Sequence, residues 1–143
     1  MIQISKEGRT LSLIDLAILE DALHLSLPSE YKAFLLTTNG GIPTPNTIDI
    51  TNLSGSPTDT QVFFGIEREI ASSNIIWNYQ NFLEGCLANE VVPIACDSFG
   101  DIFYIRCGKI DWGHILFGVR TQSDVEFFHV ANDFGSLMEK IRA

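Results

Sequence analysis

The sequence predicts one α+β domain over residues 1–143, in which helices cover a mainly antiparallel sheet. Three observations predict this class. The chain has the length of one compact domain, and 45% of its residues are hydrophobic, which is enough to form a core. Apolar residues recur at helical spacing near both ends. Between these regions, short runs rich in β-branched and aromatic residues follow one another, mostly without helices, so a doubly wound parallel sheet is not expected.

The first helix is predicted to begin at Ser12, with Asp15 three residues later as the partner of a capping box. Its main apolar face repeats at helical spacing through Leu16, Leu19 and Leu23. Ile14 and Ile18 lie on another side of the same helix. We therefore expect two sides of this helix to be covered.

The second helix is predicted to contain Pro28 in its first turn, where the missing N–H costs nothing. A regular apolar stripe follows at Tyr31, Phe34, Leu35 and Thr38. Gly40 and Gly41 are expected to end the helix, because a residue without a Cβ readily adopts the left-handed conformation found at helix ends. The segment Thr44–Thr60 is rich in small and polar residues and predicts a surface excursion around one short strand.

Five short strands are expected in the rest of the chain, at Val62–Phe64, Val91–Ala95, Ile102–Cys107, Ile115–Val119 and Val125–Val130. The turn-forming residues Asp97–Asp101 are expected to connect two of them as a hairpin. A helix around Ile75–Leu83 is predicted between the first strand and the second. A last helix is predicted after Asn132 or Asp133, either of which can cap it. Its apolar face is Phe134, Leu137, Met138 and Ile141.

The chain is acidic, with 9 Lys and Arg against 18 Asp and Glu and a formal net charge of −9. This balance argues against a general nucleic-acid-binding protein and against docking on an anionic membrane, since both depend on cationic side chains. No apolar run approaches the roughly 18 residues needed to span a bilayer. Met1–Arg9 lacks the basic-then-apolar order of a signal peptide. We therefore expect a cytoplasmic protein whose acidic charge suits a basic partner or serves solubility.

The histidines and cysteines form no recognisable catalytic or metal-binding pattern. The histidines stand far apart, at His24, His114 and His129. The cysteines contain no C-x-x-C pair and are expected to be reduced and buried: Cys86, Cys96 and Cys107. Cys96 as a nucleophile with a histidine base is an alternative, but its place at the end of an apolar run favours a structural thiol. Because no glycine-rich phosphate cradle is present either, we expect neither a metal nor a cofactor.

The most informative charge feature is the segment from Glu69 to Ile105, which contains no Lys or Arg. Its five acidic residues are Glu69, Glu84, Glu90, Asp97 and Asp101. Trp77 and Tyr79 lie in the same segment, and acidic charge beside a large aromatic side chain is typical of a protein-binding face. The alternative is a solvated acidic face with Trp77 in the core. We expect Asp97 and Asp101, which flank one turn, to accept hydrogen bonds from the backbone rather than to act as paired catalytic acids.

Several segments with clear fold-specifying roles also resemble, in order and spacing, the signature of a known family. They are Leu27-Pro28-x-x-Tyr31-Lys32-x-Phe34-Leu35 with Asn39-Gly40-Gly41-x-Pro43, then Phe63-Phe64-Gly65-Ile66, Val92-Pro93-Ile94-Ala95-x-Asp97-x-x-Gly100-Asp101, and Val130-Ala131-x-x-Phe134-x-x-Leu137. From about Ser12 to its C-terminus the chain resembles the SUKH superfamily. This group includes the fungal Smi/Knr-type regulators of cell-wall synthesis and many bacterial immunity proteins.

The resemblance implies a non-enzymatic protein-binding module. Its bacterial members imply an immunity protein that binds and neutralises a cognate toxin, and a basic nuclease domain would suit an acidic inhibitor. The alternative implied by the family is a regulatory or scaffold protein of cell-wall synthesis or signalling. A hydrolase that uses Cys96, or Asp97 with Asp101, is a third hypothesis. The partner-binding residues expected from the charge pattern are Glu67, Glu69, Trp77, Glu84, Glu90, Asp97 and Asp101.

Overall fold

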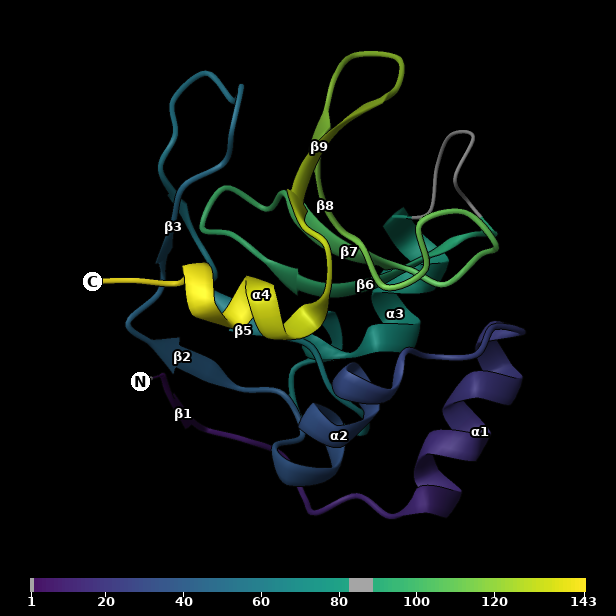
Figure 1. The fold of residues 1–143 in the computed structure, drawn as a ribbon. Helices are drawn as coiled ribbons and strands as arrows, with labels where there is room; N and C mark the ends of the chain where they lie inside the picture. Colours follow the sequence, from purple (N-terminus) through teal and green to yellow (C-terminus); the bar gives the residue numbers. More distant parts are fainter. Residues whose placement is uncertain (1, 83–88) are drawn as a thin grey trace.

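A five-stranded antiparallel sheet forms the centre of the fold in the computed structural model, which describes residues 2–82 and 89–143 (Figure 1). Its strands are neighbours in chain order: β5 (Val62–Phe63), β6 (Val91–Cys96), β7 (Ile102–Arg106), β8 (Ile115–Arg120) and β9 (Val125–Ala131). Two further sheets have two strands each: β1 (Gln3–Ser5) with β2 (Ile42–Thr44), and β3 (Thr47–Ile48) with β4 (Thr58–Asp59). The helices are α1 (Leu13–Leu23), α2 (Ser29–Thr37), η1 (Ala71–Ser73, a 3-10 turn), α3 (Ile75–Phe82) and α4 (Phe134–Lys140). The predicted α+β class is confirmed.

The helix starts follow the capping residues that the sequence contains. Ser12 caps α1 through the predicted capping box: its hydroxyl accepts from the backbone N–H of Asp15, whose carboxylate accepts from the N–H of Ser12. Asp133 caps α4 by accepting from the N–H of Ser136 at 2.7 Å, so Asp133 rather than Asn132 has this role. No helix within residues 2–82 and 89–143 combines the length and apolar character required to cross a membrane.

The prediction that Gly40 and Gly41 end α2 is wrong in its detail. The helix ends at Thr37, and Thr38 is already extended, with φ of −146°. Gly40 does have a positive φ of 67°, but it is needed for close packing against β5. A Cβ at this position would lie 2.7 Å from the carbonyl oxygen of Phe63, closer than packed atoms approach.

Aromatic side chains from three elements fill the core between the helices and the sheet. Tyr31 and Phe34 of α2, Phe63 of β5 and Phe134 of α4 form one cluster, with ring centroids 4.9–6.4 Å apart. Three of these residues are predicted apolar positions of the second and last helices: Tyr31 and Phe134 are buried, and Phe34 is partly buried. Their contacts join α2 and α4 to the edge of the sheet. The core is therefore the one that the helical spacing predicts.

The segment Thr44–Thr60 departs from its prediction as a surface excursion around one strand. It contains two strands, β3 and β4, which pair with each other. Ile48 and Ile50 are buried, so apolar contacts fix this segment to the core. The short strands β1 and β2 were not predicted, because three residues give too little periodicity to distinguish a strand from a loop.

The expectation that two sides of α1 are covered is also wrong. Leu16, Leu19 and Leu23 are buried as predicted, but Ile14 and Ile18 are 72% and 64% exposed. The main neighbour of α1 is α3, which lies along one side of it (Figure 1). Ile14 and Ile18, which are one helical turn apart, thus form an apolar row that faces solvent on α1. This exposure is unusual, because a helix with apolar residues on all sides is normally buried.

Candidate protein-binding surface

An apolar groove runs between α1 and α3, and we call it the α1–α3 groove. It encloses about 450 Å³. Its apolar lining comes from Ile18, Leu19 and Ala22 of α1 and from Ile66, Ile76 and Trp77 opposite them. The hydroxyl of Tyr79 on α3 donates to the carbonyl oxygen of Leu23 at 3.3 Å, which ties the two helices together at one end. The fold therefore presents an apolar hollow on its outer surface.

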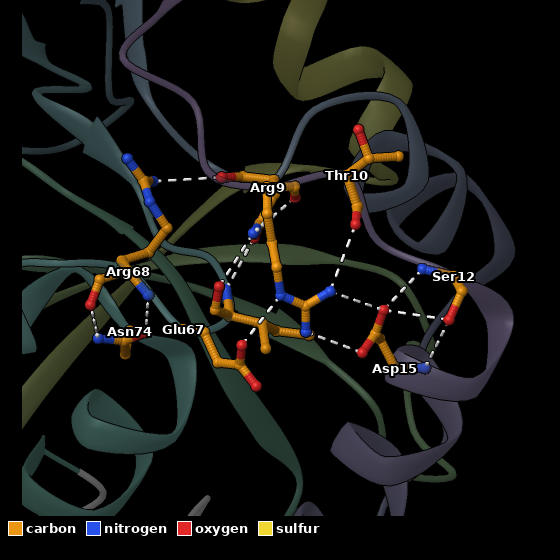
Figure 2. A network of polar contacts seen from close by, with 9 residues as sticks. Arg9, Thr10, Ser12, Asp15, Glu67, Arg68 and Asn74 are labelled. Atoms are coloured by element: carbon orange, nitrogen blue, oxygen red, sulfur yellow. Dashed lines mark hydrogen bonds and ion pairs between the residues drawn. The ribbon is translucent and has the colours of Figure 1, made fainter.

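An ion-pair bridge formed by Arg9 joins Asp15 and Glu67 (Figure 2). Both carboxylates line the groove, and we call this edge of it the mouth. The guanidinium donates through Nε to Glu67 at 2.9 Å and through two further nitrogens to both carboxylate oxygens of Asp15, at 2.9 and 3.1 Å. The bridge joins the N-terminal segment, the first turn of α1 and the loop after β5. The two carboxylates thus share the guanidinium of Arg9.

The Arg9 bridge gives Asp15 a pH-dependent role in stability. The hydrogen bonds from Arg9, and then from the backbone of Ser12, hold the pKa of the Asp15 carboxyl well below its usual range. A carboxyl whose pKa is lower in the folded state stabilises the fold above its unfolded pKa and loses this contribution as the pH falls. Between about pH 5 and the acid limit, we expect the melting temperature of Asp15→Asn to fall less steeply than that of the wild-type protein.

Thermal melts at a series of pH values, followed by circular dichroism, test this prediction. Asp21→Asn is the matched control, since Asp21 is on the same helix and its carboxylate makes no hydrogen bond or ion pair with the described residues. The control is expected to keep the wild-type pH dependence. Equal slopes for wild type and Asp15→Asn would show that the Arg9 bridge does not contribute to stability.

Asn39 connects the backbone of the N-terminal segment with the backbone of the loop after β5, next to the Arg9 bridge. It is 3% exposed, and its amide donates to the carbonyl oxygens of Arg9 at 3.1 Å and Ile66 at 2.9 Å. Its side-chain oxygen accepts from the N–H of Ile66 at 2.8 Å. Arg68 adds to this network, because its guanidinium donates to the carbonyl oxygens of Lys6 and Asn39. This positioning role of Asn39 was missed, because the sequence marks only its place before two glycines.

A second hollow of about 610 Å³ lies on the other side of Trp77, and we call it the hairpin hollow. It extends from η1 and α3 to the tip of the β6–β7 hairpin, where Phe99 is 84% exposed. Ile70, which precedes η1, is also exposed on its border. Trp77 is half-buried and lines both hollows, rather than lying in the core. Together the α1–α3 groove and the hairpin hollow form what we call the Trp77 surface.

The structure brings together only part of the predicted contact set. Glu67 lines the α1–α3 groove with Trp77, and it shares a neighbouring hollow with Glu69. Glu90 and Asp101, however, stand at opposite ends of the β6–β7 hairpin, about 20 Å apart at 3.3 Å per residue of β6. Glu84 lies outside the described residues. The acidic residues therefore belong to one segment of the sequence but do not form one continuous face of the protein.

Asp97 lines the hairpin hollow, but its side chain is almost fully buried and is engaged within its own turn. It is 2% exposed, and its carboxylate accepts from the hydroxyl of Thr58 at 2.7 Å and from the N–H groups of Phe99 and Asp101. It has the backbone-accepting role expected for a turn aspartate. Burial, and then the charge of Asp97, raise the pKa of Asp101.

The cysteines and histidines do not form a catalytic arrangement among the described residues. Burial raises the pKa of Cys96 to about 11 and that of Cys107 to about 12, so both thiols are protonated at neutral pH. Cys86 lies outside the described residues. His129 on β9 pairs with His114 at a ring distance of 5.1 Å but is three strands away from Cys96, about 14 Å at the usual strand spacing. Within the described ranges, no three His, Cys, Asp or Glu side chains are arranged to hold a metal ion.

Comparison with protein families gives a match over nearly the whole chain. The family model described as the SMI1 / KNR4 family (SUKH-1) matches residues 10–140. The chain belongs to this family. The SUKH resemblance predicted from the sequence is thereby confirmed, and SUKH-1 membership fits either an immunity role or a role of the Smi1/Knr4 type. A comparison of this SUKH-1 chain with curated proteins found no match.

Proposed function

We propose that this SUKH-1 protein is a non-enzymatic immunity protein of the cytoplasm, which binds a cognate toxin one-to-one and neutralises it. The expected toxin is a basic domain of the nuclease type. The observation that carries the proposal is the Trp77 surface, an apolar surface left open by the fold and bordered by Asp15 and Glu67. Family membership supports this class of function together with the regulatory alternative.

Two physical arguments favour a protein partner for the Trp77 surface. Exposed apolar patches bordered by polar groups are typical of protein interfaces, and tryptophan is enriched among the residues that dominate binding energy. The net charge of −9 would also accelerate encounter with a basic protein. A nuclease has such a surface, because its active-site cleft must attract phosphate groups. An acidic inhibitor can cover that cleft without any catalytic group of its own.

The direct test is co-expression with the product of a neighbouring gene, followed by purification. We expect protection of the cells, a one-to-one complex and stoichiometric loss of nuclease activity, weakened by salt. Inhibition is expected to be stoichiometric and without turnover of any substrate, because the proposed activity involves no nucleophile. If the partner captured is instead a host enzyme without toxicity, the regulatory or scaffold function of the family replaces the immunity function.

The Trp77 surface is tested by comparing Trp77→Ala with Trp112→Ala in the same binding assay. Trp112 lies in the β7–β8 loop and is half-exposed, so it controls for the loss of a surface tryptophan. We expect Trp77→Ala to weaken the complex about 30-fold or more, as central interface tryptophans do, with little effect of Trp112→Ala. Circular dichroism checks that both variants fold. If the two folded variants bind the partner with equal affinity, the Trp77 surface is not the binding surface.

A further inference from the structure

We infer that the α1–α3 groove binds a basic amphipathic helix of the partner protein. The apolar side chains of that helix enter the groove, and one of its Lys or Arg residues pairs with Glu67. The inference adds detail to the proposed function. It rests on that function in one respect, namely that the occupant of the groove is a segment of a protein. It adds the chemical class of the segment and the place where it binds.

The shape of the groove favours a helix as the occupant. Ile18 and Ala22, which both line the groove, are one turn apart on α1, so its apolar lining runs along the helix axis. α3 lies beside α1 (Figure 1). Ile76 and Trp77 of α3 line the opposite side of the groove. A third helix can place its own apolar row between two such helices, as in helix-in-groove recognition. The groove volume of about 450 Å³ is within the range of pockets that hold whole ligands. The groove therefore has room for more than one side chain of the partner.

The charges around the groove favour a basic occupant. Asp15 and Glu67 are the charged residues among its described lining, and neither α1 nor α3 contains a Lys or Arg. Arg9 pairs with both carboxylates, and the guanidinium of Arg68 donates to the backbone of Lys6 and Asn39. The acidic side of the groove is α1, which contributes the carboxylates of Asp15, Glu20 and Asp21. A second copy of this chain would bring another net charge of −9, so the charges disfavour self-association through this groove.

Glu67 is held in place as the anchor for the partner's cation. Its φ of 53° is in the left-handed region, which costs energy for a residue with a Cβ and is found at functional sites. Both neighbours are fixed, since the N–H of Ile66 donates to Asn39 and the N–H of Arg68 donates to Asn74. The side chain is 68% exposed and uses only Oε2 to accept from Arg9. Its Oε1 makes no hydrogen bond with the described residues, so it can accept from a cation of the partner.

The test is a titration of the ¹⁵N-labelled full chain with synthetic helical peptides, followed by two-dimensional NMR. One peptide carries a leucine row and lysines, a second replaces lysine by glutamate, and a third replaces leucine by serine. We expect the first peptide to shift the amides of α1, α3 and Glu67, and to bind at least about 10-fold more tightly than the glutamate peptide. The serine peptide is expected not to saturate, because it has no apolar side chains to bury.

Two isoleucine variants separate groove binding from general attraction to an acidic protein. Ile18 and Ile110 are 64% and 62% exposed, but only Ile18 lines the α1–α3 groove among the described lining residues. Each replacement by aspartate adds one negative charge. We expect Ile18→Asp to weaken binding of the lysine peptide about 10-fold despite that charge, and Ile110→Asp to bind it as well as the wild-type protein does. Glu67→Gln is expected to weaken binding of the lysine peptide and not to weaken binding of the glutamate peptide.

Several outcomes would overturn the inference: shifts confined to other elements, equal binding of the lysine and glutamate peptides, or equal effects of Ile18→Asp and Ile110→Asp. Concentration-dependent shifts of α1 and α3 before any peptide is added would instead assign the groove to a second copy. If Ile18→Asp does not weaken the toxin complex, the groove is not the binding site, although the proposed immunity function still holds. If the peptide binds in the groove but no toxin partner is found, the groove remains a helix-binding site and the proposed immunity function is rejected.

Discussion

Replacing Asn39 by alanine is expected to lower the free energy of unfolding by about 3 kcal/mol, since three buried hydrogen bonds at about 1 kcal/mol each are lost. The carbonyl oxygens of Arg9 and Ile66, and the N–H of Ile66, lose their side-chain partner at the same time. For a domain of this size we expect the melting temperature to fall by roughly 10 °C. Urea unfolding followed by circular dichroism measures the change.

Asn132→Ala is the matched control for this experiment, because Asn132 is exposed just before α4. We expect it to change stability by no more than about 0.5 kcal/mol. A loss of less than about 1 kcal/mol in Asn39→Ala would mean that water replaces the amide at little cost. The network at the groove mouth would then not depend on this residue.

Gly65→Ala is expected to cost about as much, roughly 3 kcal/mol, through a steric clash rather than lost hydrogen bonds. A Cβ at this position would lie 2.3 Å from the side-chain oxygen of Asn39 and 2.9 Å from its carbonyl oxygen. Either the amide of Asn39 moves and gives up its contacts, or the loop after β5 shifts. Both changes disturb Ile66 and Glu67, so the variant is expected to lose partner affinity as well as stability.

Gly55→Ala separates this clash from the general cost of adding a methyl group to glycine. A Cβ on Gly55 would meet nothing within 4 Å, although its φ of 88° strains any other residue. We expect a cost of about 1 kcal/mol from that strain alone. In an Asn39→Ala background, Gly65→Ala should become less costly, because the nearest clashing atom is gone. A larger loss in Gly55→Ala than in Gly65→Ala would contradict the steric explanation.

Local signals in the sequence were sufficient to predict most of the fold. The capping box of Ser12 and Asp15, the apolar stripe of α2 and the β-branched runs of β6 to β9 all specify structure within a few residues. Three-residue strands such as β1 carry no such signal, because they depend on a partner strand far away in the chain. The end of α2 was placed too late because Gly40 serves a long-range contact with Phe63.

The candidate site was predictable only in part, for the same reason. Trp77 and Glu67 could be selected from composition, but their common groove depends on α1 packing beside α3. The hairpin geometry that separates Glu90 from Asp101, and the burial of Asp97, are three-dimensional facts that charge counting cannot supply. The apolar residues around all sides of α1 did carry a signal. They predicted a second covered side, which we now assign to a partner protein.

Hydrogen–deuterium exchange of the protein alone and in complex with the proposed partner tests most directly whether α1 and α3 form the partner-binding face. We expect the amides of α1 and α3 to exchange more slowly in the complex, because a bound helix would suppress local opening there. The amides of β3 and β4 are expected to exchange at the same rate in both states, since neither strand contributes a lining residue to the α1–α3 groove. Slower exchange confined to elements other than α1 and α3 would contradict the assignment of the partner-binding face.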